Sequence, residues 1–269
     1  MKTLYISDLD GTLFRNDAKL SDRSRNIIND LVADKVNISL ATARSISSAA
    51  DALDGLYLSL PAVMMNGVFL TDINTKEQKS VCYFEKKAAK AVVDAFEMHD
   101  RPPFVYSYTD DIDTQYTAYH CEYERNFIEI RKKRYRTFEQ VSEYKFSDNI
   151  IYINAIDEPE IINKIAEDIK NIPGISFEHY PDTYSGHLDF IEVFSDKAGK
   201  WNGIQRLKEK YGFQKIVAFG DNLNDMEMIK NADIGICVEN SHPELLKCAD
   251  IVIDSNENDG VANWLLKNV

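Results

Sequence analysis

The sequence predicts an α/β fold in which a core built on a parallel sheet is interrupted by an inserted α+β domain. Short apolar runs alternate with stretches of helical periodicity near both ends of the chain, and this alternation favours a parallel sheet with right-handed crossovers. The middle of the chain departs from that pattern and is rich in tyrosine and charge. The predicted core therefore comprises residues 1–81 and 186–269, and the predicted insert comprises residues 82–185.

The first part of the core has the pattern strand, helix, strand, helix, strand. Residues 3–7 form an apolar run that stops at an Asp-Gly turn, as a buried strand should. Ser21 has the position of an N-cap in front of a helix. Further strands are expected at 37–41 and 61–65, with a helix that includes Leu53 between them.

The same patterns predict the remaining elements. In the later part of the core, strands are expected at 188–194, 215–219, 233–238 and 251–253, and helices around 201–207, 226–229 and 261–266. In the insert, helical periodicity covers 88–98 and 160–170, and strand-like runs cover 104–108, 150–155 and 175–179. His187 and Asp189 are expected at the hinge between insert and core.

The composition narrows the choice of partners and compartment. A formal net charge of −13 over 269 residues makes most of the surface repel nucleic acid. No stretch approaches the roughly 20 apolar residues that a membrane helix needs, and no signal peptide is recognisable. Four scattered cysteines without a CxxC pair favour free thiols in a reducing cytosol. We therefore expect a cytoplasmic protein that acts on a small molecule; its oligomeric state, monomer or dimer, stays open.

Polar and charged side chains follow the predicted core strands. Ligands of open parallel sheets bind at the carboxyl ends of the strands. The residues concerned are Asp8-Leu9-Asp10-Gly11-Thr12, Thr42-Ala43-Arg44, Asn66-Gly67, Lys200 and Gly220-Asp221-Asn222-Leu223-Asn224-Asp225. A purely structural α/β domain would rarely place polar and charged residues so consistently at one edge of its sheet, so we expect a ligand site there.

The spacing of Asp8 and Asp10 favours chemistry assisted by a metal ion. Two carboxylates at one strand end would repel each other, and a divalent cation with hard oxygen ligands, such as Mg²⁺, removes the conflict. Asp221 could complete the set of ligands. A carboxylate can attack phosphorus, and a second one can protonate the leaving oxygen and then activate water.

Other residues at this edge offer groups that hold a phosphoryl group. Thr42 offers a hydroxyl, the backbone N–H groups of Leu9 and Ala43 offer donors, and Lys200 offers a positive charge at the start of a helix. Two further candidates at the same edge are Arg44, balanced between a substrate contact and a structural ion pair, and Asn66.

These residues, in this order, resemble the haloacid dehalogenase superfamily of phosphohydrolases. The resemblance rests on four motifs: Asp8-Leu9-Asp10-Gly11-Thr12-Leu13, Thr42 within Ala41-Thr42-Ala43-Arg44, Lys200, and the Gly220 to Asp225 segment. The late segment Asp254 to Val261 looks like the closing stretch of the Cof-like branch, which carries an α/β cap between the second and third motifs. The resemblance therefore implies a Rossmann-like core with an inserted cap. Two small departures from the branch are Ala43 and Trp201, where glycine is common.

The resemblance also implies a role for each motif residue. Asp8 would be nucleophile and metal ligand, Asp10 would be general acid and base and would bind Mg²⁺ through its backbone carbonyl, and Asp221 would be the third ligand. Phosphate would be held by Thr42, Lys200 and Asn224, and Asp225 would support the metal site from outside. The implied activity is Mg²⁺-dependent hydrolysis of a small phosphorylated metabolite, with a sugar phosphate as the favoured substrate, through an aspartyl-phosphate.

Two alternative functions stay open. A phosphosugar mutase would share the aspartyl-phosphate step and would hold a second phosphate in the insert, for which the basic run at 131–136 is a candidate. A catalytically silent regulator that binds sugar phosphates would be expected to have lost an essential group, whereas Asp8, Asp10, Lys200 and Asp221 are all present. The first alternative is therefore the stronger one.

Structural explanations are preferred for residues outside these motifs. The basic run at 131–136 is read first as a solvated helix end. The histidines at 99, 120, 179 and 242 show no metal-ligand spacing. The tyrosines at 106, 108, 116, 119 and 123 are expected to pack within the insert rather than to line a substrate face.

Overall fold

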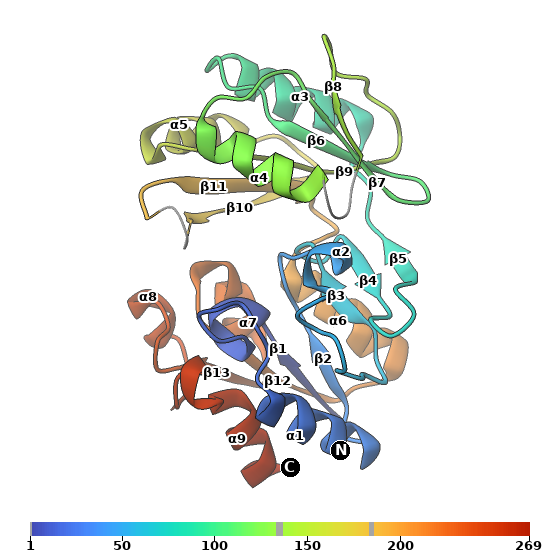
Figure 1. Ribbon diagram of the computed structural model, residues 1–269, viewed down its shortest axis with the longest axis vertical. Coiled ribbons are helices and arrows are strands. Elements are labelled where there is room, and N and C mark those ends of the chain that lie inside the picture. The colour runs from blue at the N-terminus through green and yellow to red at the C-terminus, as the bar shows by residue number, and fades with distance from the viewer. Residues whose placement is uncertain (1, 133–136, 183–185) are drawn as a thin grey trace. The chain divides into compact units, whose positions relative to one another are not determined.

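The structure of the protein is a computed structural model that describes residues 2–132, 137–182 and 186–269 (Figure 1). The chain forms two compact units. We call Met1–Val81 together with Gly199–Val269 the core unit, and Cys82–Ala198 the inserted unit. None of the helices in the described ranges combines the length and the apolar character needed to cross a membrane.

The core unit is built on a parallel sheet of five strands in the order β14-β13-β12-β1-β2, which confirms the predicted α/β fold. These strands are β1 (Thr3–Ser7), β2 (Ile38–Leu40), β12 (Lys215–Gly220), β13 (Ile234–Val238) and β14 (Ile251–Ile253). Alternate side chains of a strand point to opposite faces of the sheet, so both faces carry apolar side chains, and helices cover both. Leu4 and Ile6 of β1 pack in one apolar cluster with Ile204, whereas the Tyr5 ring contacts Trp264.

Most of the core helices begin and end close to the predicted positions, but the helix predicted to include Leu53 ends earlier, at Ala49. The core helices are α1 (Asp22–Ala33), α2 (Ile46–Ala49), α6 (Lys200–Tyr211), α7 (Met226–Asn231), α8 (Pro243–Leu246) and α9 (Gly260–Asn268), with short helical turns η1 (Leu9–Leu13), η2 (Leu223–Asp225) and η3 (Asn256–Asn258). Ser21 is the N-cap of α1, as predicted, and its Oγ accepts a hydrogen bond from the backbone N–H of Ser24 at 3.0 Å.

The strand predicted at 61–65 does not continue the parallel sheet as expected. Strand β3 (Ala62–Met64) joins that sheet through a single parallel bridge, Ala41 to Val63. It otherwise pairs antiparallel with β4 (Phe69–Thr71), which pairs with β5 (Gln78–Val81). The reason is the turn after β3, where Met65, Asn66 and Gly67 all have positive φ and reverse the chain.

The inserted unit is built on a sheet of six strands in the order β10-β11-β9-β6-β7-β8. The strands are β6 (Phe104–Tyr108), β7 (Ile112–Tyr116), β8 (Thr137–Gln140), β9 (Ile150–Asp157), β10 (Ile175–Pro181) and β11 (Asp189–Ser195), and the helices are α3 (Lys86–Glu97), α4 (Glu122–Lys132) and α5 (Pro159–Ile169). Helices α3 and α5 pack on the sheet through one apolar cluster that includes Val92, Ile153 and Ile165.

The strand predicted at 188–194 as part of the core belongs to the inserted unit instead. It forms β11, which pairs antiparallel with both β9 and β10. Its Ile191 and Val193 side chains are fully buried in the cluster beneath α3 and α5, so the strand is held there by packing as well as by pairing. Residues 186–198 therefore extend the insert beyond the predicted end at 185.

Residues that the sequence left to structural roles have packing or pairing contacts. Tyr106 and Tyr116 are buried, and their rings contact Tyr152 and Phe104. His179 Nε2 lies 2.6 Å from an oxygen of Asp189, so Asp189 pairs within the inserted unit rather than marking a hinge. The basic run at 131–136 lies mostly outside the described residues.

Candidate active site

Four segments of the core unit meet at the carboxyl end of its parallel sheet. Asp8 follows β1 and Asp221 follows β12, the parallel neighbour of β1, while Thr42 lies just beyond β2 on the other side. Lys200 lies in the first turn of α6. The structure thus gathers in one unit the segments that the sequence marked at the strand ends.

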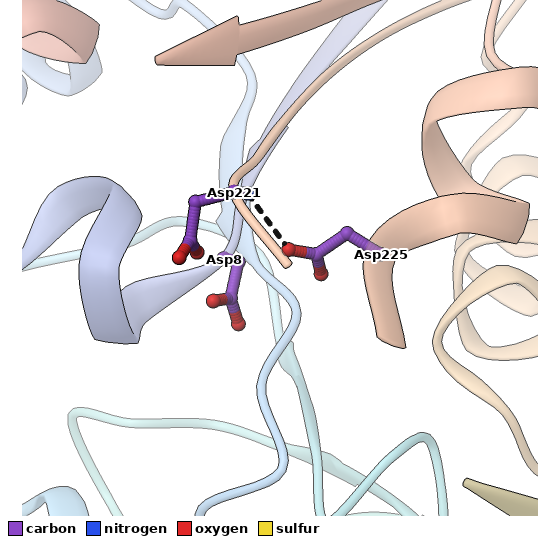
Figure 2. A group of neighbouring side chains, drawn as sticks. All are labelled: Asp8, Asp221 and Asp225. Atoms are coloured by element: carbon purple, nitrogen blue, oxygen red, sulfur yellow. Dashed lines mark hydrogen bonds between the residues drawn. The ribbon is translucent and has the colours of Figure 1, made fainter. Parts of the chain in front are cut away.

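Three carboxylates lie together at this edge. Asp8, Asp221 and Asp225 each offer an oxygen, and the three oxygens lie within 4.8 Å of one another. Figure 2 shows the Asp8 and Asp221 side chains directed into one region, with Asp225 approaching from the start of a helix. Carboxylate oxygens are ligands that Mg²⁺ prefers, so this set of donors fits a divalent cation.

Asp225 supports the other two carboxylates. Its side chain is fully buried, and its Oδ1 accepts a hydrogen bond from Lys200 Nζ at 2.6 Å. Its Oδ2 accepts from the backbone N–H groups of Asp221 at 3.0 Å and Asn222 at 3.2 Å. Because both oxygens are occupied, Asp225 fixes the loop that carries Asp221, and the oxygens left for a cation are those of Asp8 and Asp221.

Lys200 bridges two of the carboxylates. Its Nζ donates to Asp8 Oδ1 at 2.8 Å as well as to Asp225, and the residue is only 4% exposed. The neighbouring Trp201, a departure from the family pattern, packs against the core cluster. Lys200 therefore contacts the Asp8 and Asp225 carboxylates even though tryptophan follows it in the sequence.

The charges of this cluster are unbalanced. Burial raises the pKa of Asp8 well above its usual range, and the carboxylates of Asp225 and Asp221 add to this effect while Lys200 opposes it. Burial, with Asp225 next, raises the pKa of Asp221 to about 7. Burial alone would lower the pKa of Lys200, but Asp225 and Asp8 raise it further, so the lysine stays charged. A divalent cation would stabilise the ionised carboxylates.

Asp10 faces Arg44 rather than the three clustered carboxylates. Arg44 donates to both Asp10 oxygens, from Nε at 2.7 Å and from a terminal nitrogen at 2.5 Å. The Arg44 backbone N–H donates to Thr42 Oγ1 at 3.1 Å, and the Arg44 guanidinium lies over the Phe14 ring. Of the two explanations left open for Arg44, this structure contains the ion pair.

The loops after β2 and β3 are tied to the start of α6. The Asn66 backbone N–H donates to the Thr42 carbonyl at 3.0 Å, and the Asn66 carbonyl accepts from the Gly199 N–H at 2.6 Å. Asn66 and Thr42 are each 1% exposed. Ala43 lies between Thr42 and Arg44, so its backbone is held by bonds on either side.

Asn224 lies in η2, one turn beyond Asp221. Its side-chain Oδ1 is buried without a hydrogen-bond partner in the described part of the chain. Asn222 is the N-cap of this turn, where its side chain and that of Asp225 form a capping box. The sequence assigned a phosphate contact to Asn224 and no role to Asn222.

Sequence reasoning missed three residues that contact this site. Thr12 Oγ1 donates to Asp221 Oδ1 at 2.7 Å, and its position within the first motif was the available signal. Asn240 Nδ2 donates to the Gly11 carbonyl at 2.8 Å, and Asn256 Nδ2 donates to the Phe14 carbonyl at 2.9 Å. Asn256 lies in the closing segment that contributed to the family resemblance, whereas no sequence signal distinguished Asn240.

This site on this fold defines a class of protein. A model of the haloacid dehalogenase-like hydrolase family matches residues 5–265, so the chain belongs to that family, and it is a phosphatase within it. Two curated relatives from Bacillus subtilis (strain 168) are named 5-amino-6-(5-phospho-D-ribitylamino)uracil phosphatases, YitU and YcsE. The chain is 24% identical to YitU over 268 residues, covering 97% of this chain and 96% of YitU. It is 24% identical to YcsE over 280 residues, covering 98% and 96%.

A solved structure with the same fold is the subclass IIB sugar phosphatase BT4131. The TM-score is 0.75 at 18% sequence identity, and the match covers 98% of each chain. At that identity the likeness speaks for the fold, and it extends over the inserted unit as well as the core.

Replacing Gly11 by Ala is expected to lower phosphatase activity by about 10²-fold. Gly11 has φ +73°, and a Cβ there would lie 2.3 Å from Asp221 Oδ2. The new methyl group would therefore push the Asp221 carboxylate out of place. The measurement is kcat/KM for a phosphate ester as a function of Mg²⁺ concentration.

Gly212→Ala is the matched control for this substitution. Gly212 also has positive φ, +68°, but a Cβ there meets nothing within 4 Å. Both variants share a backbone cost of about 1–2 kcal/mol, and only Gly11→Ala disturbs Asp221. Equal losses of activity in the two variants would show that strain, not displacement of Asp221, is the cause.

Proposed function

We propose that the protein is a Mg²⁺-dependent phosphatase that hydrolyses a sugar phosphate or a similar polyhydroxylated phosphate ester through an aspartyl-phosphate at Asp8. The observation that carries the proposal is the buried Asp8 carboxylate, bound by Lys200 on one oxygen and adjacent to the Asp221 carboxylate. A buried carboxylate with one oxygen still available is a suitable nucleophile for phosphorus.

Mg²⁺ would be held by the carboxylates of Asp8 and Asp221 and by the backbone carbonyl of Asp10. It would supply positive charge beside the phosphoryl oxygens. The excess of carboxylates over cations, expressed in the raised pKa of Asp8 and Asp221, supports a divalent ion there.

The chain's own residues divide the chemistry between them. An Asp8 oxygen attacks phosphorus while the bond to the leaving oxygen breaks, and Asp10 gives its proton to that oxygen. Asp10, now a carboxylate, takes a proton from water as the water oxygen attacks phosphorus. The bond between phosphorus and Asp8 then breaks, which releases inorganic phosphate and restores both aspartates.

The phosphoryl oxygens would be held by fixed donors during both steps. We assign this role to the Thr42 hydroxyl, the Lys200 ammonium, the Asn224 side chain and the backbone N–H groups of Leu9 and Ala43. In this structure Arg44 donates to both Asp10 oxygens, so one of these two hydrogen bonds would have to open before Asp10 could pass a proton to the leaving oxygen. Donors that need no rearrangement as charge develops are the main source of catalysis in phosphoryl transfer.

The inserted unit is proposed as the cap that selects the substrate. Two relatives are named for a phosphate ester of a ribityl chain and a structural neighbour is named a sugar phosphatase. These leaving groups are all polyhydroxylated alcohols. The mutase alternative depended on the basic run at 131–136, most of which lies outside the described residues, and no described residue adds a specific observation in its favour.

The test is phosphate release across a panel of esters, measured once with Mg²⁺ and once with EDTA. The panel includes hexose and pentose phosphates, 5-amino-6-(5-phospho-D-ribitylamino)uracil, flavin mononucleotide, pyridoxal phosphate and nucleoside monophosphates. We expect release from the hexose, pentose and ribityl phosphates at least about tenfold faster than from the nucleoside monophosphates, and loss of release in EDTA.

Two outcomes would contradict the proposal. Release that persists in EDTA would contradict the role of the metal ion. Isomerisation of a sugar phosphate without release of phosphate would instead indicate a mutase.

A further inference from the structure

Two asparagine side chains donate hydrogen bonds to the loop that follows the proposed nucleophile Asp8. Asn240 Nδ2 donates to the Gly11 carbonyl at 2.8 Å. Asn256 Nδ2 donates to the Phe14 carbonyl at 2.9 Å. The two asparagines are also bonded to each other, because Asn240 Oδ1 accepts from the Asn256 backbone N–H at 3.0 Å. They therefore link the segments after β13 and β14 to the loop of residues 9–14. We call Asn240 and Asn256 together the asparagine bracket.

The loop of residues 9–14 has an irregular backbone, so its shape depends on contacts with other parts of the chain. Within η1, Asp10 (φ −69°, ψ 125°) and Gly11 (φ 73°, ψ −8°) have non-helical backbone angles. A backbone hydrogen bond from the Phe14 N–H to the Leu9 carbonyl, at 2.7 Å, closes the turn. The two carbonyls that accept hydrogen bonds from the asparagines belong to Gly11, directly after Asp10, and to Phe14, at the end of the turn.

We propose that Asn240 and Asn256 are positioning residues that hold the backbone of Asp10 where its carboxyl can pass a proton to the leaving oxygen. This inference rests on the proposed function, in which Asp10 is the general acid. Arg44 fixes the tip of the Asp10 side chain, and the asparagine bracket fixes the backbone from which that side chain extends. Proton transfer needs the Asp10 backbone in place, because it requires hydrogen-bond distance from the carboxyl to the leaving oxygen, and it also needs one of the two Arg44 hydrogen bonds to open.

Other residues near the C-terminal end of the chain bind the residues just after this loop and the start of α1. Glu257 accepts from the Asn16 N–H at 2.6 Å, and Asp259 accepts from Arg15 at 3.0 Å. Asp259 accepts hydrogen bonds from Ser21 Oγ and Ser24 Oγ at the start of α1. Asn263 accepts from Arg23 at 2.9 Å and donates to the Asn258 carbonyl at 2.8 Å. These contacts fasten α1 to the C-terminal end of the chain. Asn263 is a matched control, since it is the same residue type, and its side-chain hydrogen bonds in the described ranges go to Arg23 and Asn258 rather than to residues 9–14.

The experiment compares two leaving groups in the full-length protein. p-Nitrophenolate is a weak base that leaves without a proton, whereas the alkoxide of a sugar phosphate needs one. The quantity measured is kcat/KM, because it covers the steps up to release of the alcohol and excludes the later hydrolysis of the aspartyl-phosphate. The substrates are p-nitrophenyl phosphate and the sugar phosphate that the wild type hydrolyses fastest.

We expect Asn256→Ala and Asn240→Ala to lose at least about tenfold more kcat/KM on the sugar phosphate than on p-nitrophenyl phosphate. Asn263→Ala should lose equally little on both. Asn256 is 2% exposed, so its variant could fail to fold. Asn240 is exposed, so its variant keeps the test available. Equal losses on the two substrates in Asn240→Ala would overturn the inference and leave the bracket a structural role.

Asp10→Asn separates this inference from the proposed function. If Asp10 is the general acid, Asp10→Asn shows the same preference for p-nitrophenyl phosphate in a stronger form. A leaving-group preference in Asp10→Asn without one in the asparagine variants would refute the bracket alone. No leaving-group preference in Asp10→Asn would refute the acid role itself, and the inference would fall with it.

Discussion

Asp8→Asn is expected to reduce phosphate release by at least about 10³-fold while the core unit stays folded. An amide oxygen does not attack phosphorus to give a stable acyl phosphate, so the first step is lost. The fold should survive because asparagine keeps an oxygen that can accept the 2.8 Å hydrogen bond from Lys200. Burial and neighbouring carboxylates raise the pKa of Asp8, so a neutral side chain there should not lower the free energy of unfolding.

Phosphate release and thermal denaturation of the same samples test this expectation. Asp54→Asn is the control, because Asp54 is an exposed residue of the core unit and its variant carries the same change in net charge. Appreciable turnover by Asp8→Asn would remove Asp8 from the role of nucleophile. A variant that loses both activity and folding would leave Asp8→Ala as the second test.

Lys200→Met is expected to cost both stability and activity. It leaves the Asp8 and Asp225 carboxylates buried without the cation that bonds to each of them. Removing one partner from a buried ion pair costs about 3–5 kcal/mol of unfolding free energy. Turnover should fall by at least about 10²-fold, because the positive charge beside the phosphoryl group is lost as well.

The stability loss should depend on pH in a defined direction. Burial raises the pKa of Asp8 and Asp221 and Lys200 opposes this effect, so without Lys200 these two pKa values in the folded protein lie further above those in the unfolded chain. The folded state then binds more protons than the unfolded state, so stability rises as the pH falls. Denaturant unfolding in EDTA should therefore show a smaller gap between variant and wild type at acidic pH than at neutral pH.

Two further variants isolate the cause of that loss. The double variant Lys200→Met, Asp225→Asn should recover part of the stability, because one uncompensated charge is gone, but none of the activity. Lys230→Met, at an exposed lysine of α7, should change neither. A single Lys200→Met variant as stable as wild type would mean that the buried carboxylates are neutral without the lysine.

Much of the fold could be predicted because the core strands are short, apolar and stopped by polar turns. Prediction failed where the apolar pattern identifies a strand but does not say which strands it pairs with. The apolar pattern of residues 188–194 identifies a strand, but only its pairing with β9 and β10 shows which sheet it joins. Residues 61–65 also read as a strand, and the positive φ of Met65 was not predictable, because methionine seldom adopts it.

Asp8, Thr42 and Asp221 are brought together in the core unit because each follows a strand of one parallel sheet, whereas Lys200 enters the site from the first turn of α6. Residue type and position identified Asp8, Asp221 and Lys200 without knowledge of distances. The ion pair between Arg44 and Asp10 was one of two open explanations, since sequence does not give the direction of a long side chain. Asn240 and Asn256 act on backbone carbonyls, which have no sequence signature, so the bracket emerged only from the structure.

The place of β11 decides where this chain can be divided for expression. A fragment cut after residue 185 would leave β11 attached to the core unit, with the apolar side chains of Ile191, Val193 and Phe194 exposed to solvent. It would also strip β9 and β10 of their shared neighbour, and unpaired strand edges invite aggregation. A shortened enzyme should instead rejoin Val81 to Gly199, the ends of the two core segments, while the excised piece, residues 82–198, keeps its sheet complete.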